Sequence, residues 1–230
     1  MGVPVIYRRT GEKAIASYNY TDIADATGNV IFNGFAHQEQ TSVSYALNAE
    51  AFYSEGVGIT NPDLENGYTS VAGNTSSFNK DMDLDFDVVL NRSQRIKGKA
   101  WAQFTWGSPD TTDALARGEG YIICRIRKWD GTTETEISSA QSETLVVDAN
   151  AGHYASTNIL IDLPTITHFK KGDTLRVTIE YWWKKTNTNA RYIRFYHDPQ
   201  NALILAFGGT ASGFTYPTTF KAHIPFMIGL

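Results

Sequence analysis

Hydrophobic and polar residues alternate one by one along much of this chain, with a period of two. The clearest example lies between Phe169 and Trp183, where the sequence reads FKKGDTLRVTIEYWW. After a Gly-Asp turn, Leu175 and every second residue up to Trp183 fall on one face of an extended segment, and Thr174 and every second residue up to Trp182 fall on the other. This alternation predicts an amphipathic β-strand from Thr174 to Trp183.

The same pattern recurs through the rest of the chain, and helical periodicity is nearly absent. The Asp-Gly pair of Trp129-Asp130-Gly131-Thr132 is typical of a tight hairpin turn. We therefore predict an all-β protein, an antiparallel β-sandwich of jelly-roll-like form, with residues 1–230 making a single domain. Further strands are expected at 3–7, 14–20, 29–35, 43–53, 82–90, 96–106, 121–129, 133–138, 144–148, 158–163, 191–196, 203–207 and 220–228.

One segment departs from the alternation. Residues 54–79 are rich in Gly, Asn, Ser and Thr and show no sustained periodicity. Loops of this length are uncommon in compact domains and often have a function. We predict one long loop at about 54–79, and we expect it to take part in contacts with a partner.

Composition and net charge indicate which partners and which cellular location we expect for this chain. The chain has 42% hydrophobic residues and a net charge of −4, which favours neither nucleic acid nor an anionic membrane. The start of the sequence lacks a signal peptide, and no apolar run is long enough to span a membrane. Cys124, the single cysteine, alternates with apolar neighbours and is expected to be a buried small hydrophobe. We expect a protein made in the cytoplasm.

Four aspartates alternate with apolar residues near the middle of the chain. Asp81, Asp83, Asp85 and Asp87 would project from one face of a strand, about 7 Å apart, and would repel one another. The stretch does not fit a calcium-binding EF-hand loop. Such a loop needs Gly at its sixth position and Glu at its twelfth, and this chain has Phe86 and Arg92 there. The basic residues that follow, Arg92, Arg95, Lys97 and Lys99, are the expected counter-charges, on a neighbouring strand. A bound cation or a basic partner surface remains an alternative.

No arrangement of residues indicates an enzyme. The five histidines are scattered without metal-binding spacing, and the glycines of 208–213 lack the lysine of a phosphate-binding loop. The sequence alone leaves open a pair of carboxylates of the kind that hydrolyses glycosides, because their separation is a three-dimensional property. We therefore predict no enzymatic activity, no catalytic residue, no metal site and no cofactor.

Two tryptophans lie on faces that are otherwise polar. Trp182 follows Arg176 on the polar face of its strand, and Trp101 shares a face with Lys99 and Gln103. Interfaces between proteins are enriched in Trp and Arg, so Trp101, Arg176 and Trp182 are the candidate interface residues. Burial of the outer face by a second sheet, or a platform for stacking a sugar ring, would explain the same pattern.

The late part of the chain resembles a known class of proteins. The succession FKKGDTLRVTIEYW, RYIRFYHDPQNA and KAHIPFMIGL is similar to tailed-bacteriophage virion structural proteins of the jelly-roll or β-sandwich type, such as decoration, minor capsid and head-fibre proteins. The resemblance extends over roughly the last 70 residues. It implies location in the virion, a homo-oligomer or symmetric lattice, and contacts with other capsid proteins.

The leading hypothesis is therefore a non-enzymatic protein that binds and stabilises a phage capsid through protein-protein contacts. The alternative is a carbohydrate-binding module or a receptor-binding tip protein that uses an exposed tryptophan. These two functions differ in the surface that each requires, so the arrangement of the tryptophans in the fold bears on both.

Overall fold

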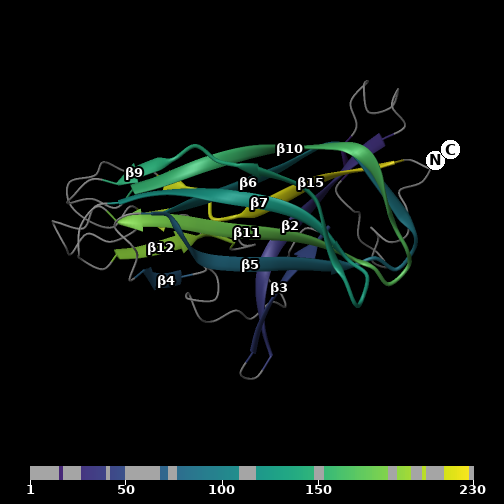
Figure 1. The fold of residues 1–230 in the computed structure, drawn as a ribbon, viewed down its shortest axis with the longest axis horizontal. Coiled ribbons are helices and arrows are strands. Elements are labelled where there is room, and N and C mark those ends of the chain that lie inside the picture. Colours follow the sequence, from purple (N-terminus) through teal and green to yellow (C-terminus); the bar gives the residue numbers. More distant parts are fainter. Residues whose placement is uncertain are drawn as a thin grey trace.

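The computed structural model describes residues 16–17, 27–39, 42–49, 68–71, 77–108, 118–147, 153–185, 191–197, 204–205 and 215–227, and every element in these ranges is a β-strand (Figure 1). The predicted all-β class is confirmed. The strands are β1 (Ala16–Ser17), β2 (Thr27–Glu39), β3 (Ser42–Asn48), β4 (Tyr68–Val71), β5 (Asn79–Val89), β6 (Gln94–Ser108), β7 (Gly118–Trp129), β8 (Glu134–Gln141), β9 (Leu145–Val147), β10 (His153–Phe169), β11 (Thr174–Lys185), β12 (Arg191–Phe195), β13 (Ile204–Leu205), β14 (Thr215–Tyr216) and β15 (Phe220–Met227).

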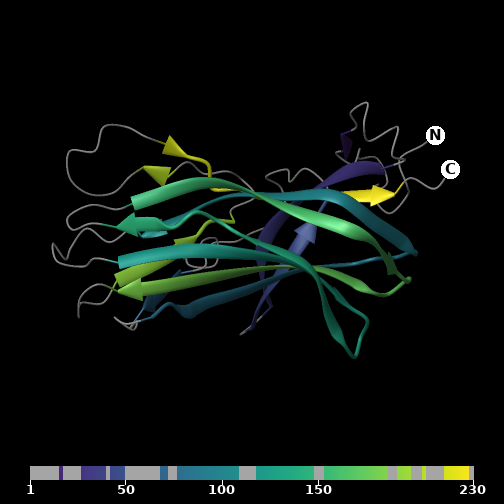
Figure 2. The same cartoon turned by 45° about the horizontal axis from the view of Figure 1, so that its top comes forward.

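The main sheet folds over into the two layers of a sandwich (Figure 2). Its strands are hydrogen-bonded in the order β4-β12-β6-β15-β2-β3-β5-β11-β7-β8, with β1, β10 and β9 attached to β2, β6 and β7. The first layer contains β12, β6, β15, β2 and β10, and the second contains β5, β11, β7 and β8. Every recorded strand pair is antiparallel except β3 with β5, which are parallel over two residue pairs. The sheet does not close, because its path ends at β4 and β8.

The core lies between the two layers and is rich in aromatic rings. Trp106 of β6 meets Tyr181 of β11 edge to face, with ring centroids 5.1 Å apart. Phe86 of β5 packs on Phe220 of β15 at 4.8 Å. These contacts join strands of opposite layers, and all four side chains are buried. The apolar face of β11 predicted from the sequence is therefore the face that enters the core.

Two predicted turns are present, each with a glycine at positive φ. Gly131 (φ 96°) lies in the hairpin between β7 and β8, and Gly172 (φ 95°) lies between β10 and β11. The β10–β11 turn is bonded to the β5–β6 turn, because Leu90 N donates to Asp173 O at 2.9 Å and Gly172 N donates to Leu90 O at 2.8 Å. These turns therefore lie together at one end of the sandwich.

The structure places strand β4 inside the predicted loop of residues 54–79, where β4 pairs with β12. Residues 54–67 and 72–76 lie outside the described residues, as do the strand expected at 3–7 and the glycines of 208–213. In the part of the chain that is described, no helix is long and apolar enough to cross a membrane.

Candidate functional site on the outer faces of the two layers

The outer face of the second layer carries a network of charged side chains above the central strand β11. The polar face of β11 lies on this side, as the alternation predicted, yet Thr178 and Glu180 are almost fully buried there. β11 is paired with β5 on one side and β7 on the other. Thr178 Oγ1 donates to Asp85 of β5 at 2.6 Å, and Arg125 of β7 donates to Glu180 at 2.9 Å, so side chains of both neighbours contact the buried positions of this polar face.

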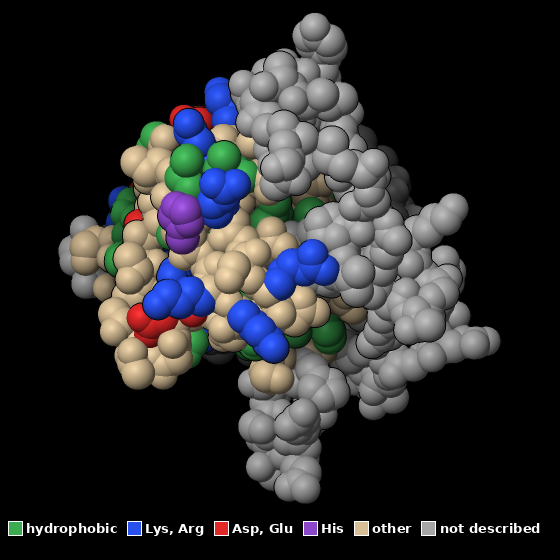
Figure 3. All heavy atoms as spheres, turned by 90° about the vertical axis from the view of Figure 1, so that its right-hand side faces the viewer, with side chains coloured by type: hydrophobic (Ala, Val, Ile, Leu, Met, Phe, Trp, Pro, Cys, Tyr) green, Lys and Arg blue, Asp and Glu red, His purple; other side chains and the backbone are tan. Residues whose placement is uncertain are grey.

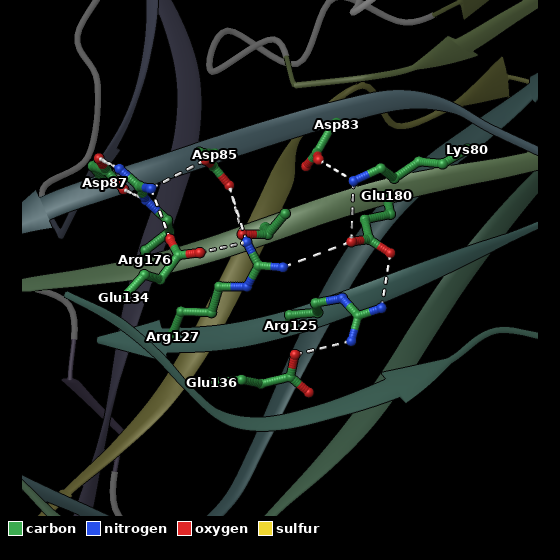
Figure 4. A network of polar contacts seen from close by, with 11 residues as sticks. Lys80, Asp83, Asp85, Asp87, Arg125, Arg127, Glu134, Glu136, Arg176 and Glu180 are labelled. Atoms are coloured by element: carbon green, nitrogen blue, oxygen red, sulfur yellow. Dashed lines mark hydrogen bonds and ion pairs between the residues drawn. The ribbon is translucent and has the colours of Figure 1, made fainter. Parts of the chain in front are cut away.

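Glu180 is the centre of this network, with a side chain only 4% exposed. Its carboxylate accepts a hydrogen bond from Arg125 Nη2 at 2.9 Å and another from Trp182 Nε1 at 3.0 Å. Lys80 and Arg127 lie 3.6 and 3.7 Å away (Figure 4). Burial raises the pKa of the Glu180 carboxyl, but the hydrogen bonds and positive charges outweigh it, so the pKa is lowered.

Arg176 lies at the other end of the network and binds Asp87 and Glu134. Its Nε and Nη2 donate to the two oxygens of Asp87, each at 2.7 Å, and its Nη1 donates to Glu134 at 2.8 Å (Figure 4). Asp85 lies 3.2 Å from the same Nη1. The hydrogen bonds to Asp87 are the main cause of the raised pKa of Arg176. The guanidinium group that the sequence nominated for an interface is thus engaged within the chain.

The aspartates obtain their counter-charges from a different source than the sequence predicted. Asp83, Asp85 and Asp87 are paired with Lys80, Arg127 and Arg176. The expected partners at 92–99 are wrong for these aspartates, because β6 does not pair with β5 and belongs to the opposite layer. Asp81 lies at an irregularity in the β5–β11 register, and burial raises the pKa of its carboxyl against the charge of Lys185. Among the described residues, no group of three or more His, Cys, Asp or Glu could hold a metal ion.

Three aromatic rings adjoin this network at the end of β11. Trp182 stacks with Tyr121 of β7 at 6.2 Å between ring centroids and an interplanar angle of 11°. Tyr121 also contacts Phe78 at 4.8 Å. Lys184 lies over the Phe78 ring, with Nζ 4.9 Å from its centroid, and pairs with Glu119. All three rings are partly exposed, so they form an accessible aromatic cluster.

Trp101 lies on the outer face of the first layer, on β6. It stacks on His223 of β15 at 4.5 Å and 20°. Its β10 neighbour in the register is Leu160, which is 53% exposed, and Ile31 of β2 is the neighbour of His223 on the other side. The row Ile31, His223, Trp101 and Leu160 therefore crosses four adjacent strands.

The three candidate interface residues do not form one surface. Arg176 and Trp182 share the outer face of β11, whereas Trp101 lies on the layer opposite. The sequence did not indicate the partners of Trp101, because Ile31, His223 and Leu160 come from distant parts of the chain. The sequence signal for Leu160 is that it is apolar although it lies between Ile159 and Ile161, which are buried, and so falls on the opposite face of the strand.

The single cysteine and one of the five histidines, His197, are buried. Cys124 is fully buried, as predicted, and burial raises the pKa of its thiol to about 12. His197 is enclosed between Tyr45 and Phe86, and burial lowers its pKa to about 4. These two groups belong to the core.

Comparisons with known proteins extend to the fold only. No protein-family model matches the sequence, and no curated protein matches it. Among solved structures, the chain is similar to a CocE/NonD family hydrolase from Staphylococcus aureus, with 13% identity and a TM-score of 0.42. It is also similar to an aminopeptidase from a marine sediment Thaumarchaeota archaeon (8%, 0.47) and to an α-amino acid ester hydrolase (8%, 0.48). The matches cover 84–85% of this chain and 36% of each of those chains.

These neighbours correct one expectation. All three are named as hydrolases or as an aminopeptidase, which contradicts the expectation that the chain is not an enzyme, and we do not maintain it. The chain spans about a third of the length of these structures. The activities belong to the named proteins.

Proposed function

We propose that this chain is a structural protein of a virion assembly, which docks on neighbouring protein subunits through the outer face of its first layer. The observation that carries this proposal is the row Ile31, His223, Trp101 and Leu160. The four residues lie opposite one another in the register of β2, β15, β6 and β10. Neighbouring strands are about 4.8 Å apart, so the row is roughly 15 Å long.

The row has the character of an interface centre. Leu160 is exposed, and the other three side chains are partly exposed. Burial, with a contribution from Lys221, lowers the pKa of His223 to about 4, so its ring is neutral at neutral pH. A neutral row that contains a tryptophan matches the aromatic and aliphatic anchors at the centre of protein interfaces.

Replacement of Leu160 by Lys tests this function, because it places a charge at the exposed end of the row, beside Trp101. We expect association with capsids that lack the chain, or with itself, to weaken at least about tenfold, as for an interface hot spot. Val146→Lys is the matched control, since Val146 is 60% exposed on β9 in the other layer. Cosedimentation and sedimentation velocity measure both. A native chain that binds neither capsids nor itself contradicts the proposal.

Carbohydrate binding is the second candidate function, favoured by the cluster of Phe78, Tyr121 and Trp182. The C–H face of a sugar ring is attracted to the negative face of an aromatic ring. The nearby pair of Glu180 and Arg125 holds the Trp182 ring in place through the indole N–H. The backbone of β11 is bonded on both sides, so a ligand here would be recognised by side chains.

An array of immobilised neutral oligosaccharides tests this candidate. We expect binding to be lost in Trp182→Ala and kept in Trp101→Ala, which removes a partly exposed tryptophan from the opposite layer. Equal loss in both variants, or no binding by the native chain, argues against a sugar site at Trp182.

A further inference from the structure

Basic residues gather at the end of the sandwich where the β5–β6 and β10–β11 turns meet. The turns are joined by the backbone bonds between Leu90 and the segment Gly172–Asp173. Figure 3 shows this end, with Lys and Arg side chains spread over the described surface and hydrophobic side chains among them. We call this group the basic end; its members are Arg92, Arg95, Lys97, Lys170 and Lys171.

The basic end has no counter-charge within the described part of the chain. Four of its five residues are exposed and the fifth is partly exposed, and none of them forms an ion pair with a described residue. The nearby Asp173 is bonded to Lys128 at 2.9 Å, and Asp130 accepts hydrogen bonds inside its own turn. Asp162 lies 4.0 Å from Lys99, next along β6. The carboxylates around the basic end are therefore already engaged, and its cations face solvent.

The net charge of the whole chain does not describe this surface. The chain carries −4 in total, but the described residues include 16 Lys and Arg against 13 Asp and Glu, a net charge of +3. The expectation that neither nucleic acid nor an anionic membrane is favoured rested on the total. A local excess of exposed positive charge attracts an anionic surface whatever the sign of the total, because salt screens charges that lie further away.

Exposed aliphatic side chains lie among these cations. Val89 is 64% exposed and Ile166 is 42% exposed, and they are two of the four large apolar side chains that are exposed in the described residues. Val89 directly precedes Leu90 at the β5–β6 turn. Ile166 lies in the irregular part of β10, two residues before His168, which faces Arg95. The end of the sandwich thus presents positive charge and apolar side chains together.

We infer that the basic end binds the surface of an anionic lipid bilayer. Lys and Arg residues are attracted to anionic headgroups, and aliphatic side chains enter the boundary between the headgroups and the acyl chains. A nucleic acid also offers phosphates, but its backbone has no apolar region for Val89 and Ile166. Neither these two residues nor the members of the basic end include an aromatic ring on which a base could stack. This inference goes beyond the proposed function and does not depend on it.

Cosedimentation of the full chain with lipid vesicles tests this inference. We expect binding to vesicles of two parts phosphatidylcholine and one part phosphatidylserine, weaker as salt is raised, and no binding to phosphatidylcholine alone. Lys170→Ser with Lys171→Ser should weaken binding about tenfold. The control pair, Gln141→Glu with Thr144→Glu, changes the net charge equally at exposed sites away from the basic end, and should have a smaller effect.

Two valines of similar exposure test the apolar part of the contact. Val89 lies at the basic end, and Val146, which is 60% exposed, lies on β9 at the opposite end of the sandwich (Figure 1). We expect Val89→Ser to weaken binding to the anionic vesicles about threefold and Val146→Ser to leave it unchanged. Because both sites are exposed, the thermal unfolding midpoint should stay close to that of the native chain in both variants.

Three results would overturn the inference: no binding to the anionic vesicles, equal binding to phosphatidylcholine alone, or equal weakening in a test variant and its control. Single-stranded and duplex DNA are the competing probes. Tighter binding of either one, lost in the Lys170 and Lys171 double variant and kept in Val89→Ser, would identify a nucleic acid and also overturn it. Vesicle binding that Leu160→Lys abolishes would place the contact at the apolar row instead, whereas loss of capsid docking alone in that variant supports separate surfaces.

Discussion

Removal of the buried Glu180 carboxylate should destabilise the fold far more than removal of the exposed Glu136 carboxylate, although both bind the same arginine, Arg125. Arg125 donates to Glu180 through Nη2 and to Glu136 through Nη1, each at 2.9 Å. The side chain of Glu180 is 4% exposed, and that of Glu136 is 41% exposed. Glu180→Ala and Glu136→Ala each remove a hydrogen bond from Arg125, one buried and one exposed. Each variant also removes one further hydrogen bond, from Trp182 Nε1 to Glu180 and from Ser139 Oγ to Glu136.

The expected cost of Glu180→Ala follows from its contacts. A hydrogen bond to a charged group contributes about 1.5–3 kcal/mol, and breaking a fully buried ion pair costs about 3–5 kcal/mol. Arg125 and Arg127 are partly exposed and Lys80 is exposed, and all three keep another carboxylate after the change, which reduces the penalty. We expect a loss of about 2–3 kcal/mol in the free energy of unfolding, and at most about 1 kcal/mol for Glu136→Ala.

Urea unfolding monitored by tryptophan fluorescence measures both values. In thermal unfolding, a loss of 2–3 kcal/mol corresponds to a fall of roughly 4–12 °C in the midpoint for a chain of this size. If the two variants lose the same stability, burial of the carboxylate is not what gives the contact its strength, and the reasoning is refuted.

Three further predictions concern acid, packing and thiol reactivity. The Glu180 carboxyl has a pKa below its usual 4.5 in the folded chain, so its contribution to stability is present above about pH 4.5 and lost as pH falls through the folded pKa. The difference in unfolding free energy between the native chain and Glu180→Gln should therefore shrink on acidification. A constant difference contradicts this. Gly120→Ala would place a methyl carbon 2.6 Å from Trp183 and 2.8 Å from Tyr181, so we expect a loss of about 1–3 kcal/mol in urea unfolding; an unchanged midpoint contradicts the packing. Cys124 should react with iodoacetamide only after unfolding, because its thiol is buried and has a pKa of about 12; mass spectrometry of the folded chain should show no adduct.

The alternation of residues was enough to predict the class of fold and much of its local structure. β11 begins at the predicted Thr174, and its apolar face enters the core. The turns at Gly131 and Gly172 are also where the residue types predicted them. These features depend on neighbours in the sequence, and such neighbours determine the facing of a strand and the conformation of a tight turn.

The candidate surfaces could not be predicted in the same way, because they depend on strand order. Arg127 neutralises Asp85 only because β11 lies between β7 and β5 and brings them near. Arg95 was expected to be a counter-charge for the aspartates of β5, but the chain turns after β5 and β6 lies in the opposite layer. The separation of Trp101 from Trp182 has the same cause. Sequence spacing contains no information about which strand follows which across a sheet.

The position of β15 has a consequence for the order in which the fold is made. β15 lies between β2 and β6, so residues 220–227 join a strand made near the start of the chain to one made near its middle. Until residue 227 has left the ribosome, β2 and β6 each have an edge without its final partner. Contacts over such long separations in sequence make folding slow, and open strand edges are prone to aggregation. Synthesis of this protein should therefore depend on protection of the nascent first layer until its last strand arrives.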